Sequence, residues 1–521
     1  MNLLKKHVLR LAGAAVLSLS VILPQTASSE EVKVAVRMFG AGKGNPYSGC
    51  NCTPGVFAWA PVFETLTKLN EDGTPGPLLA TSWENVEPTR WRFKLQEGHV
   101  FSNGEPVTAQ AAKATFDFWW TDEGGVFSQS KTMKNFVKAV EVVDDHTLDV
   151  ITHAPNPILP MNMRDPAVIA PKDFADRGVA GITKEPVGSG PYMITFTEED
   201  AVAVPNPKAN RPIKDVTKIS LKVLPEAPSR TQALVSGQID INTAMSADEA
   251  AAVEAAGMKV FARPSTRTMG ITIVSYRNGK PVEGPMGDVR VRQALNYAVD
   301  KKGIAEALFL GKYARPSTQP AFPGINGYNP ALKGYPYNPD KAKALLAEAG
   351  YPDGKGLKFE VRAIVNDEAF KNAYEAAIQD IRQLGVDATL IAQQFAGTGQ
   401  WLEHWLKGDW PYEGFGIGFD LTATMDAARV WNVFASCKKH GGKAPYFCDE
   451  GDMPMIKAAN EEFDPEKRRG ILRELGKITM EKAPIVFLVE FDELMGYNPR
   501  IKNFSHHLLQ IPYETFEVSS R

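Results

Sequence analysis

The stretch from Arg90 to Trp119, RWRFKLQEGHVFSNGEPVTAQAAKATFDFW, predicts a strand, a turn and a helix in succession. In residues 90–95 three apolar side chains alternate with three basic ones, which is the period of a half-buried strand. The Asn103-Gly104 pair marks a turn. Thr108 then caps a helix whose apolar residues recur at helical spacing.

Strand and helix patterns alternate on both sides of this stretch. Residues 219–223 alternate as a strand, and residues 291–299 place apolar side chains on one helical face. A further helix starts at Asn338, with proline in its first turn, and stops at Gly350. There is no repeat period and no long low-complexity stretch. The mixture predicts an α/β architecture.

Length and composition predict a large globular chain of several units. The 521 residues are 44% hydrophobic and 23% charged, enough to bury a core without disulfides as its main support. Because domains usually span about 100–200 residues, we expect roughly three units, or two lobes with an insertion. The 58 basic and 61 acidic residues give a net charge of −3. This balance argues against a general nucleic-acid binder, which usually has a basic excess.

Residues 1–29 have the pattern of a secretory signal peptide. Three basic residues precede the apolar run Leu11–Leu23, and small residues follow it. The run is shorter than the ~20 residues that a membrane-spanning helix needs. Without these 29 residues the chain loses three of its 58 basic residues and no acidic one, which leaves a net charge of −6. We expect a soluble, exported, periplasmic protein; an uncleaved membrane anchor is the alternative.

An oxidising compartment would favour disulfides among the four cysteines, Cys50, Cys52, Cys437 and Cys448. Pairing of Cys437 with Cys448 would close a polar, Gly-rich loop and is our prediction. Cys50 and Cys52 would then pair in a tight ring or stay reduced, and cross-pairing of the two clusters is the alternative. The spacing of Cys50, Cys52 and His440 suits zinc poorly, so we expect no metal site.

The sequence lacks the local signatures of common catalysts. It has no Gly-x-Ser-x-Gly elbow, no phosphate-binding Gly-Lys-Ser/Thr loop and no His-Glu-x-x-His motif. Gly188–Tyr192 reads as a structural turn. Gly414, Gly416 and Gly418 alternate with apolar residues, which indicates a strand that another backbone approaches closely, not a dinucleotide fingerprint. The sequence therefore points to no catalyst and to no cofactor, and a triad assembled across the fold from among its eight histidines stays an open alternative.

Several sequence blocks occur in a fixed order along the chain. They are residues 62–66 (VFETL), 77–83 (PLLATSW), 91–95 (WRFKL), 101–104 (FSNG), 186–192 (PVGSGPY), 233–237 (ALVSG), 288–295 (DVRVRQAL) and 338–342 (NPDKA). Together they resemble the oligopeptide-binding type, family 5, of ABC-transporter extracellular solute-binding proteins. The resemblance covers nearly the whole chain after residue 29.

The resemblance implies a two-lobed periplasmic-binding-protein fold with an extra subdomain inserted in the first lobe. A small solute would be trapped between closing lobes and passed to an inner-membrane ABC permease, with no reaction catalysed. We expect a monomer. The expected units are a signal peptide (1–29), a first lobe (30–66 with 187–276 and 490–521), an inserted subdomain (67–186) and a second lobe (277–489).

Three segments are our candidates for the solute crevice, each with a structural alternative. The first segment is residues 40–55, which could instead form an ordered surface loop. The second is residues 263–280, whose charged side chains could instead be solvated on the surface. The third, 390–420, combines free backbone N–H groups at a predicted helix start with aromatic side chains, which alternatively belong to the core. The candidate residues are Tyr47, Asn51, Arg267, Lys280, Thr398, Gly399, Trp401, Phe419 and Asp420.

Asp420 closes a motif that bears on the choice of solute. In peptide-binding relatives a Gly-x-x-x-Asp segment followed by Asp-Pro supplies the acid that holds the peptide's amino terminus. Residues 416–420 match the first part, but residues 421–427 lack Asp-Pro. We therefore favour an anionic opine or a sugar phosphodiester of the agrocinopine kind, and a short peptide remains the alternative.

Two other classes of function remain as alternatives. A secreted hydrolase acting on a peptide or a phosphodiester would use Asp420, Asp426 and His404 in the same cleft. A chaperone-like or sensory protein would instead bind exported peptides broadly and weakly. Ligand binding without chemical change to the ligand separates the transport role from the hydrolase.

Overall fold

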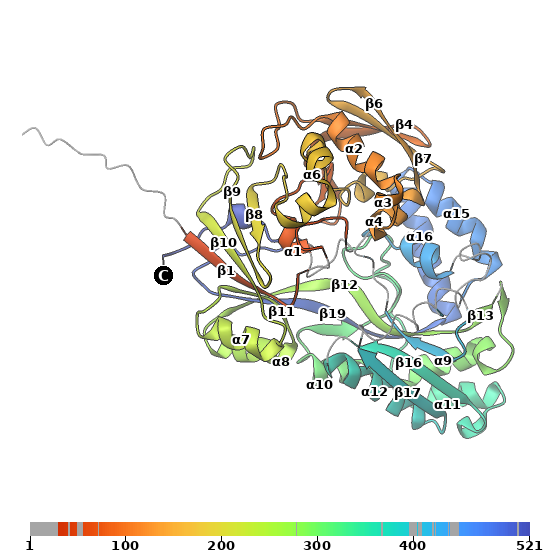
Figure 1. Ribbon diagram of the computed structural model, residues 1–521. Coiled ribbons are helices and arrows are strands. Elements are labelled where there is room, and N and C mark those ends of the chain that lie inside the picture. Colours follow the sequence, from red (N-terminus) through yellow and green to blue (C-terminus); the bar gives the residue numbers. More distant parts are fainter. Residues whose placement is uncertain are drawn as a thin grey trace, which may run out of the picture.

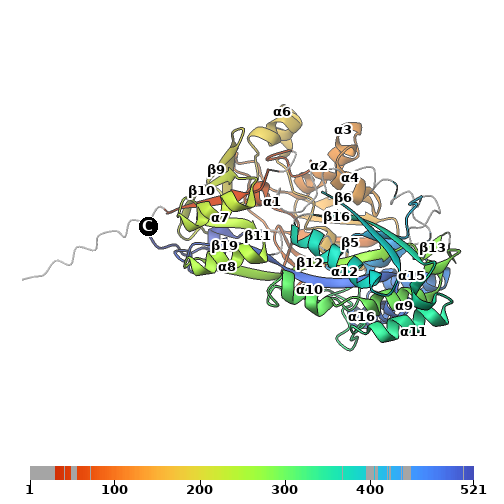
Figure 2. The ribbon, with the colours of Figure 1, turned by 90° about the horizontal axis from the view of Figure 1, so that it is seen from below.

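The structure is a computed structural model that shows two layered lobes with a further subdomain above them (Figures 1 and 2). Long strands run through the middle of the molecule, and helices cover both ends. The described residues are 30–39, 42–48, 56–70, 72–277, 279–365, 368–394, 404, 409–418, 421, 424–435, 437, 447–507 and 510–520.

One large sheet joins the two lobes. Among the described residues it has eleven strands, ten of which follow one another in a single path, while β15 (Ala314–Pro316) pairs with β19 outside that path. The path is β17 (Asp387–Gln394), β16 (Lys358–Val365), β18 (Gly414–Gly416), β12 (Lys259–Ile273), β19 (Ile485–Tyr497), β11 (Ile241–Met245), β1 (Glu30–Val36), β10 (Val216–Val223), β9 (Asp200–Pro205) and β8 (Tyr192–Phe196).

The two longest strands, β12 and β19, cross from one lobe to the other (Figure 1). They pair antiparallel, from Lys259 opposite Tyr497 to Thr272 opposite Ile485. At one end β19 also pairs with β11, and at the other end β12 also pairs with β18. We call β12 and β19 the crossover strands, because every strand of one lobe reaches the other lobe's strands through them.

The first lobe is built on β1, which pairs parallel with β10 and β11. The predicted strand at 219–223 is confirmed within β10. The hairpin β8–β9 extends this part of the sheet through an antiparallel pairing of β9 with β10. Helices α1 (Val56–Trp59), α7 (Ala227–Val235) and α8 (Ala247–Ala255) belong to this lobe.

The stretch from Arg90 to Trp119 forms part of the inserted subdomain. The predicted strand is β5 (Arg90–Leu95), and the predicted helix is α2 (Ala109–Trp119), whose first turn donates a backbone N–H to the Thr108 hydroxyl at 3.3 Å. Both predictions are confirmed. Strand β5 lies in a four-stranded sheet ordered β4 (Ala80–Glu87), β5, β7 (Thr147–Thr152) and β6 (Val137–Asp144). The subdomain's other elements are β2 (Thr67–Leu69), β3 (Pro75–Pro77), α3 (Asp122–Gly125), α4 (Ser128–Lys134), α5 (Leu159–Asn162) and α6 (Pro171–Lys184).

The second lobe surrounds the parallel pair β16 and β17. The predicted helices at 291–299 and from Asn338 are confirmed as α9 (Val289–Ala298) and α11 (Pro339–Glu348), and Asn338 caps α11 through its side chain. The other elements are α10 (Lys301–Leu308), α12 (Glu368–Arg382), α14 (Ala428–Val430), α15 (Met453–Glu461), α16 (Pro465–Lys482) and the hairpin β13 (Tyr276–Arg277) with β14 (Lys280–Pro281).

The glycines of β18 allow the close backbone approach that their alternation predicted. Strand β18 lies between β16 and β12. A Cβ on Gly416 would collide with Ala363 of β16, and one on Gly418 would collide with the Thr268 carbonyl of β12. The segment after β18 therefore runs against the crossover strand.

Two large hydrophobic cores lie in the described part of the molecule. One continues from the first-lobe strands into the inserted subdomain and into second-lobe residues such as Trp431 and Leu472, and the other lies mainly between the second-lobe strands and helices α9 and α12. No helix among the described residues is long and apolar enough to cross a membrane.

A buried arginine connects both ends of the described chain. The Arg500 side chain, 8% exposed, donates from Nε to Asp240 Oδ1 at 2.7 Å and from Nη1 to Glu30 Oε2 at 3.1 Å. It also donates to the Glu31 carbonyl. These contacts hold β1, the start of β11 and the C-terminal segment together.

Replacing Arg500 with Met should destabilise the protein by about 3–5 kcal/mol, because two buried carboxylates lose their counter-charge. The control is Arg177→Met, which removes a more exposed pair with Asp173 within α6 and should cost at most about 1 kcal/mol. Thermal unfolding of the three proteins measures both effects. Equal melting temperatures for the two variants would contradict this role of Arg500.

Candidate solute-binding site

The strand directions indicate where a ligand can bind. Strands β1 and β11 run parallel in the first lobe and end at Val36 and Met245, while β16 ends at Val365 in the second lobe. In open α/β sheets, ligands bind outside the carboxyl ends of the strands. Helix α8 begins directly after β11, and α12 begins at Glu368, shortly after β16. The candidate site lies where these ends meet the crossover strands.

The crossover pair is irregular at this place. From Pro264 to Thr268, four steps along β12 match only two steps along β19. The extra residues form a bulge, and bulges bend a strand and redirect its side chains. Arg267 lies in this bulge and is half-buried.

A cavity of about 220 Å³ opens beside the bulge and is bordered by both lobes. Arg267 contributes its charge, and the aromatic rings of Phe309, Tyr313, Phe370 and Phe491 contribute apolar surface. Ligand pockets commonly combine such apolar walls with a few polar groups. The remaining lining residues are Thr243, Ala244, Met245, Ser246 and Ala247 from β11 and α8, Ala369 from α12, and Asp492, Glu493, Leu494 and Met495 from β19.

Charged side chains of the crossover strands are arranged as ion pairs around this cavity. Arg263 of β12 pairs with Glu493 of β19. Arg315 of β15 donates to Glu490 at 2.9 Å and to Asp492 at 3.2 Å. Burial raises the pKa of Glu490 to about 7, although Arg315 opposes this shift. The strands at the lobe boundary therefore carry a carboxyl group that titrates near neutral pH.

The structure separates the two basic residues predicted to bind the solute. Arg267 lines the interlobe cavity. Lys280 lies on the hairpin β13–β14, is exposed, and is absent from the residues that line this cavity. The local sequence does not reveal that Arg267 lines the cavity and Lys280 does not, because the position of Arg267 depends on a bulge that forms only when β12 pairs with β19.

The assignment of Tyr47 to the crevice is corrected by its burial. Its ring is fully buried against Phe118 and Trp119, and its hydroxyl donates to the Ala167 carbonyl at 2.8 Å. With its ring and its hydroxyl both engaged in the protein interior, Tyr47 packs the core and does not reach a solute. The other candidates, Asn51, Thr398, Gly399, Trp401, Phe419 and Asp420, lie outside the described residues.

The aromatic wall of the cavity was not predicted from the sequence. Phe370 belongs to the first turn of α12 and packs edge-on against Phe491 of β19, with ring centroids 4.8 Å apart. Tyr313 follows α10 and pairs through its backbone with Asp492. These residues are far apart along the chain, so no local motif joins them. Their positions near the ends of strands and helices were the one feature of the sequence from which they could have been predicted.

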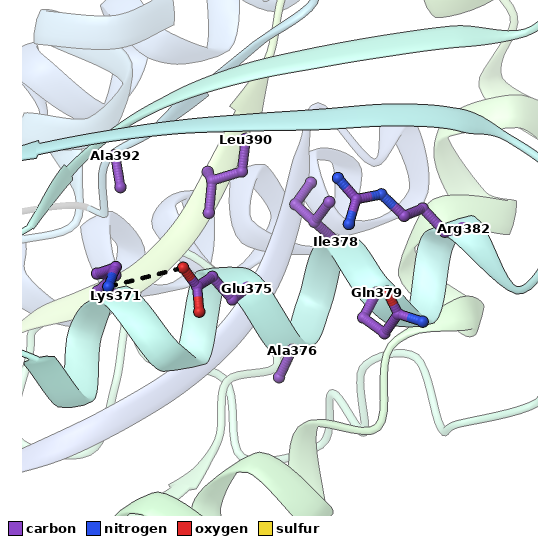
Figure 3. A pocket seen from close by; sticks show the side chains of 8 residues that line it. All are labelled: Lys371, Glu375, Ala376, Ile378, Gln379, Arg382, Leu390 and Ala392. Atoms are coloured by element: carbon purple, nitrogen blue, oxygen red, sulfur yellow. Dashed lines mark ion pairs between the residues drawn. The ribbon is translucent and has the colours of Figure 1, made fainter.

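A cavity of about 600 Å³ lies elsewhere, on the outer edge of the second lobe (Figure 3). Its walls are α12, including Lys371, Glu375 and Arg382, and the edge strand β17 with Leu390 and Ala392. All of its lining residues belong to one lobe, so a movement between lobes would not enclose a solute there. The cavity beside the bulge fits capture better.

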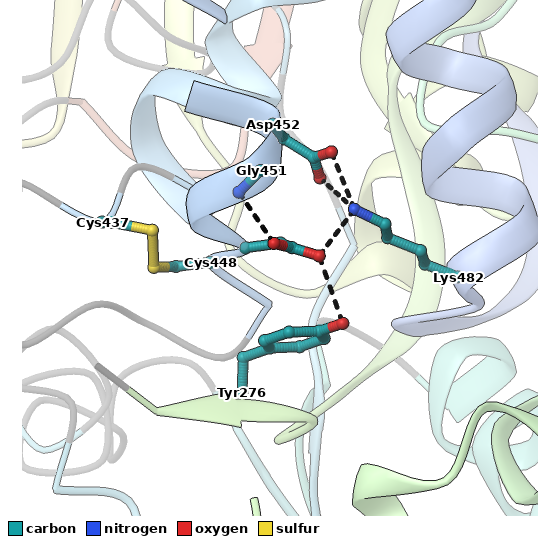
Figure 4. The surroundings of a disulfide bond; sticks show 7 residues. Tyr276, Cys437, Cys448, Gly451, Asp452 and Lys482 are labelled. Carbon is teal, nitrogen blue, oxygen red and sulfur yellow. Dashed lines mark hydrogen bonds and ion pairs between the residues drawn. A yellow bond between two sulfur atoms is a disulfide. The ribbon is translucent and has the colours of Figure 1, made fainter. Parts of the chain in front are cut away.

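Cys437 and Cys448 form a disulfide, which is the pairing that the sequence favoured (Figure 4). The next residue, Asp449, accepts hydrogen bonds from Lys482 at 2.8 Å and from the Tyr276 hydroxyl at 3.3 Å. Despite the opposing effect of burial, these donors lower the pKa of Asp449. The bridge thus anchors a segment that links α16 to the hairpin after β12.

Two of the three residues proposed for a hydrolase, Asp426 and His404, lie among the described residues, and each contacts another side chain. Asp426 is buried and accepts from Arg468 Nη2 at 2.9 Å and from Asn326 at 2.8 Å. His404 is exposed and contacts Asp409 at 3.1 Å. The Asp426 carboxylate is thus engaged in a buried ion pair with Arg468. Among the described residues, these two do not form a hydrolytic pair.

Comparison with known proteins identifies the family. The model of the bacterial extracellular solute-binding proteins, family 5, matches residues 74–439, well over half of the chain. The chain belongs to this family. As the sequence resemblance predicted, this family 5 protein is the solute-binding component of an ABC importer.

Individual relatives cover most of the chain. The nickel-binding periplasmic protein of Escherichia coli (strain K12) is 29% identical over 88% of this chain and 90% of its own. The dipeptide-binding protein of the same organism is 25% identical over 97% of this chain and 99% of its own. Both relatives therefore match this chain over nearly their full length.

Solved structures share the two-lobed α/β fold that the sequence predicted. NikA of Brucella suis, in complex with Fe(III)-EDTA, has a TM-score of 0.78 at 23% identity, covering 94% of this chain and 100% of that chain. The binding protein AgaA of A. tumefaciens R10, in complex with agropinic acid, has a TM-score of 0.74 at 21% identity, covering 94% and 99%.

The raised pKa of Glu490 makes stability depend on pH. Because the folded protein holds this proton up to about pH 7 and the unfolded chain releases it near 4.5, the contribution of Glu490 to wild-type stability should fall as pH rises from 5 to 8. The two pKa values correspond to about 3 kcal/mol at most. Glu490→Gln should remove this loss, so its melting temperature relative to wild type should rise with pH. The exposed Glu306→Gln should show no such trend, and parallel curves for E490Q and wild type would contradict the assignment.

Proposed function

We propose that this family 5 protein is exported, loses residues 1–29, and captures a small polar organic solute with an acidic group in the periplasm. It then delivers the solute, as a monomer, to an inner-membrane ABC permease. The cavity beside the β12 bulge carries the proposal, because it combines a basic side chain with residues of both lobes.

Capture requires the two lobes to favour a closed arrangement when solute is present. A solute that touches both lobes binds the closed form more tightly and shifts the population toward it. Moving the ratio from 1:99 to 99:1 takes about a 10⁴-fold difference in affinity. We place the moving bodies at 30–66 with 187–276 and 490–521, at 67–186, and at 277–489. The crossover strands link these bodies.

The cavity's chemistry supports an anionic, partly apolar solute. Arg267 suits a carboxylate or phosphate, and the aromatic wall suits a ring or carbon chain. The two lining carboxylates, Asp492 and Glu493, are paired with Arg315 and Arg263. Among similar proteins, one structure holds agropinic acid, and named relatives bind nickel or dipeptides. We favour an opine or sugar-phosphate-like solute, with Asp420 as a further contact, and a short peptide as the second candidate.

Mass spectrometry of whatever co-purifies with the protein identifies the solute class. Calorimetry with opines, sugar phosphates and dipeptides then measures affinity, while the same samples are checked for chemical change. The proposal expects saturable binding, a higher melting temperature and an unchanged ligand. Conversion of the ligand into product would instead support the secreted hydrolase.

The positions of the two basic residues predict unequal effects on binding. Arg267→Met should weaken binding of the co-purifying solute at least tenfold, or about 1.4 kcal/mol, because the cavity loses a positive charge. Lys280→Met is the matched control and should stay within about twofold of wild type, because Lys280 is exposed on the hairpin. Calorimetry measures both affinities. Unchanged affinity in R267M would remove Arg267 from the site.

A further inference from the structure

A second cavity, of about 290 Å³, lies against the crossover strand β12. It too is bordered by segments of both lobes, and it is distinct from the cavity that contains Arg267. Its lining residues are Leu69, Asn70 and Gly73 near β2 and β3, Phe261 and Arg263 of β12, Met425 before α14, and Ser505, His506 and His507 of the C-terminal segment.

His506 is the unusual residue of this cavity. Its side chain is 5% exposed and lies between Phe57 and Phe261, at ring-centroid distances of 5.7 and 6.4 Å. Its Nε2 atom is buried and has no hydrogen-bond partner within the part of the chain that the structure describes. Buried polar groups are nearly always hydrogen-bonded, and leaving one unsatisfied is costly. Because Nε2 itself is shielded from solvent, a ligand group in the cavity supplies the missing partner once the His506 ring turns toward the cavity.

The charges around His506 select the kind of ligand. Burial, then Arg263, then the neighbouring His507 lower the pKa of His506 well below its ordinary value, so the ring is neutral. Arg263, paired with Glu493 of β19, lines the same cavity. None of the described lining residues is acidic. A cation would meet the Arg263 charge unfavourably, whereas an anion gains from both that charge and an imidazole N–H.

We propose that this cavity receives a carboxylate or phosphate group of the solute, which accepts a hydrogen bond from His506 Nε2 and faces Arg263. This inference rests on the proposed function and adds a binding place for a second acidic group of the solute, besides the one that faces Arg267. Met425 comes from the second lobe, and Leu69 and Asn70 from the opposite side. An acidic group held here therefore touches both lobes and favours their closed arrangement.

Two substitutions of His506 separate a ligand-binding role from a structural one. His506→Phe keeps an aromatic ring but removes the unpartnered nitrogen, so the ligand-free protein should melt about 1–4 °C higher. The same variant should bind anions at least tenfold more weakly. His506→Gln keeps an N–H donor and should lose less affinity than His506→Phe. The exposed His153→Gln is the control and should match wild type in both measurements.

The probes are inorganic phosphate and malonate, titrated separately by calorimetry into the full chain without its leader, and Ni²⁺ alone. If phosphate alone binds, the cavity prefers a phosphate group, and if malonate alone binds, it prefers a carboxylate. Either result supports the inference, provided that the H506F variant binds that anion more weakly. Wild-type affinity in H506F, absence of anion binding, or Ni²⁺ binding that requires His506 would overturn it. A neutral solute that binds wild type and H506F equally would overturn this inference while leaving the proposed function intact.

Discussion

The antiparallel pairing of β12 with β19 is the constraint on which the rest of the structure depends. These strands are the link between the first-lobe and second-lobe parts of the described sheet, so their register determines how the two parts face each other. The bulge between Pro264 and Thr268 lies at the boundary and orients Arg267 toward one interlobe cavity. Arg263, just before the bulge, lines the other. The two basic side chains, one just before the bulge and one within it, thus line two different cavities.

Polar and charged groups are concentrated along this boundary, where burial makes their interactions strong. Arg263 pairs with Glu493, and Arg315 bridges Glu490 and Asp492. Such pairs stabilise the protein only while both partners remain in place, since an unpaired buried charge is costly. Their arrangement gives the crossover strands a defined geometry, and the two large apolar cores, each of which includes residues of both lobes, pack around them.

The fold was largely predictable because its elements follow local periodicity. The strand at β5, the helix capped by Thr108 and the close approach at Gly416 each depend on neighbours in sequence, and the structure contains all three. The site was less predictable, since it is assembled from distant segments. Tyr47 was misassigned because a tyrosine in a Gly-rich segment suits a core as well as a crevice. His506 escaped notice because its burial depends on rings that lie far away in the chain.

The central claim is that solute closes the two lobes about the crossover strands. Small-angle X-ray scattering of the protein, first freed of its co-purifying solute and then saturated with it, tests this claim most directly. We expect a smaller radius of gyration with solute for wild type, and no change for Arg267→Met at the same solute concentration. An identical radius of gyration for free and saturated wild-type protein, with saturation verified by calorimetry, would contradict it.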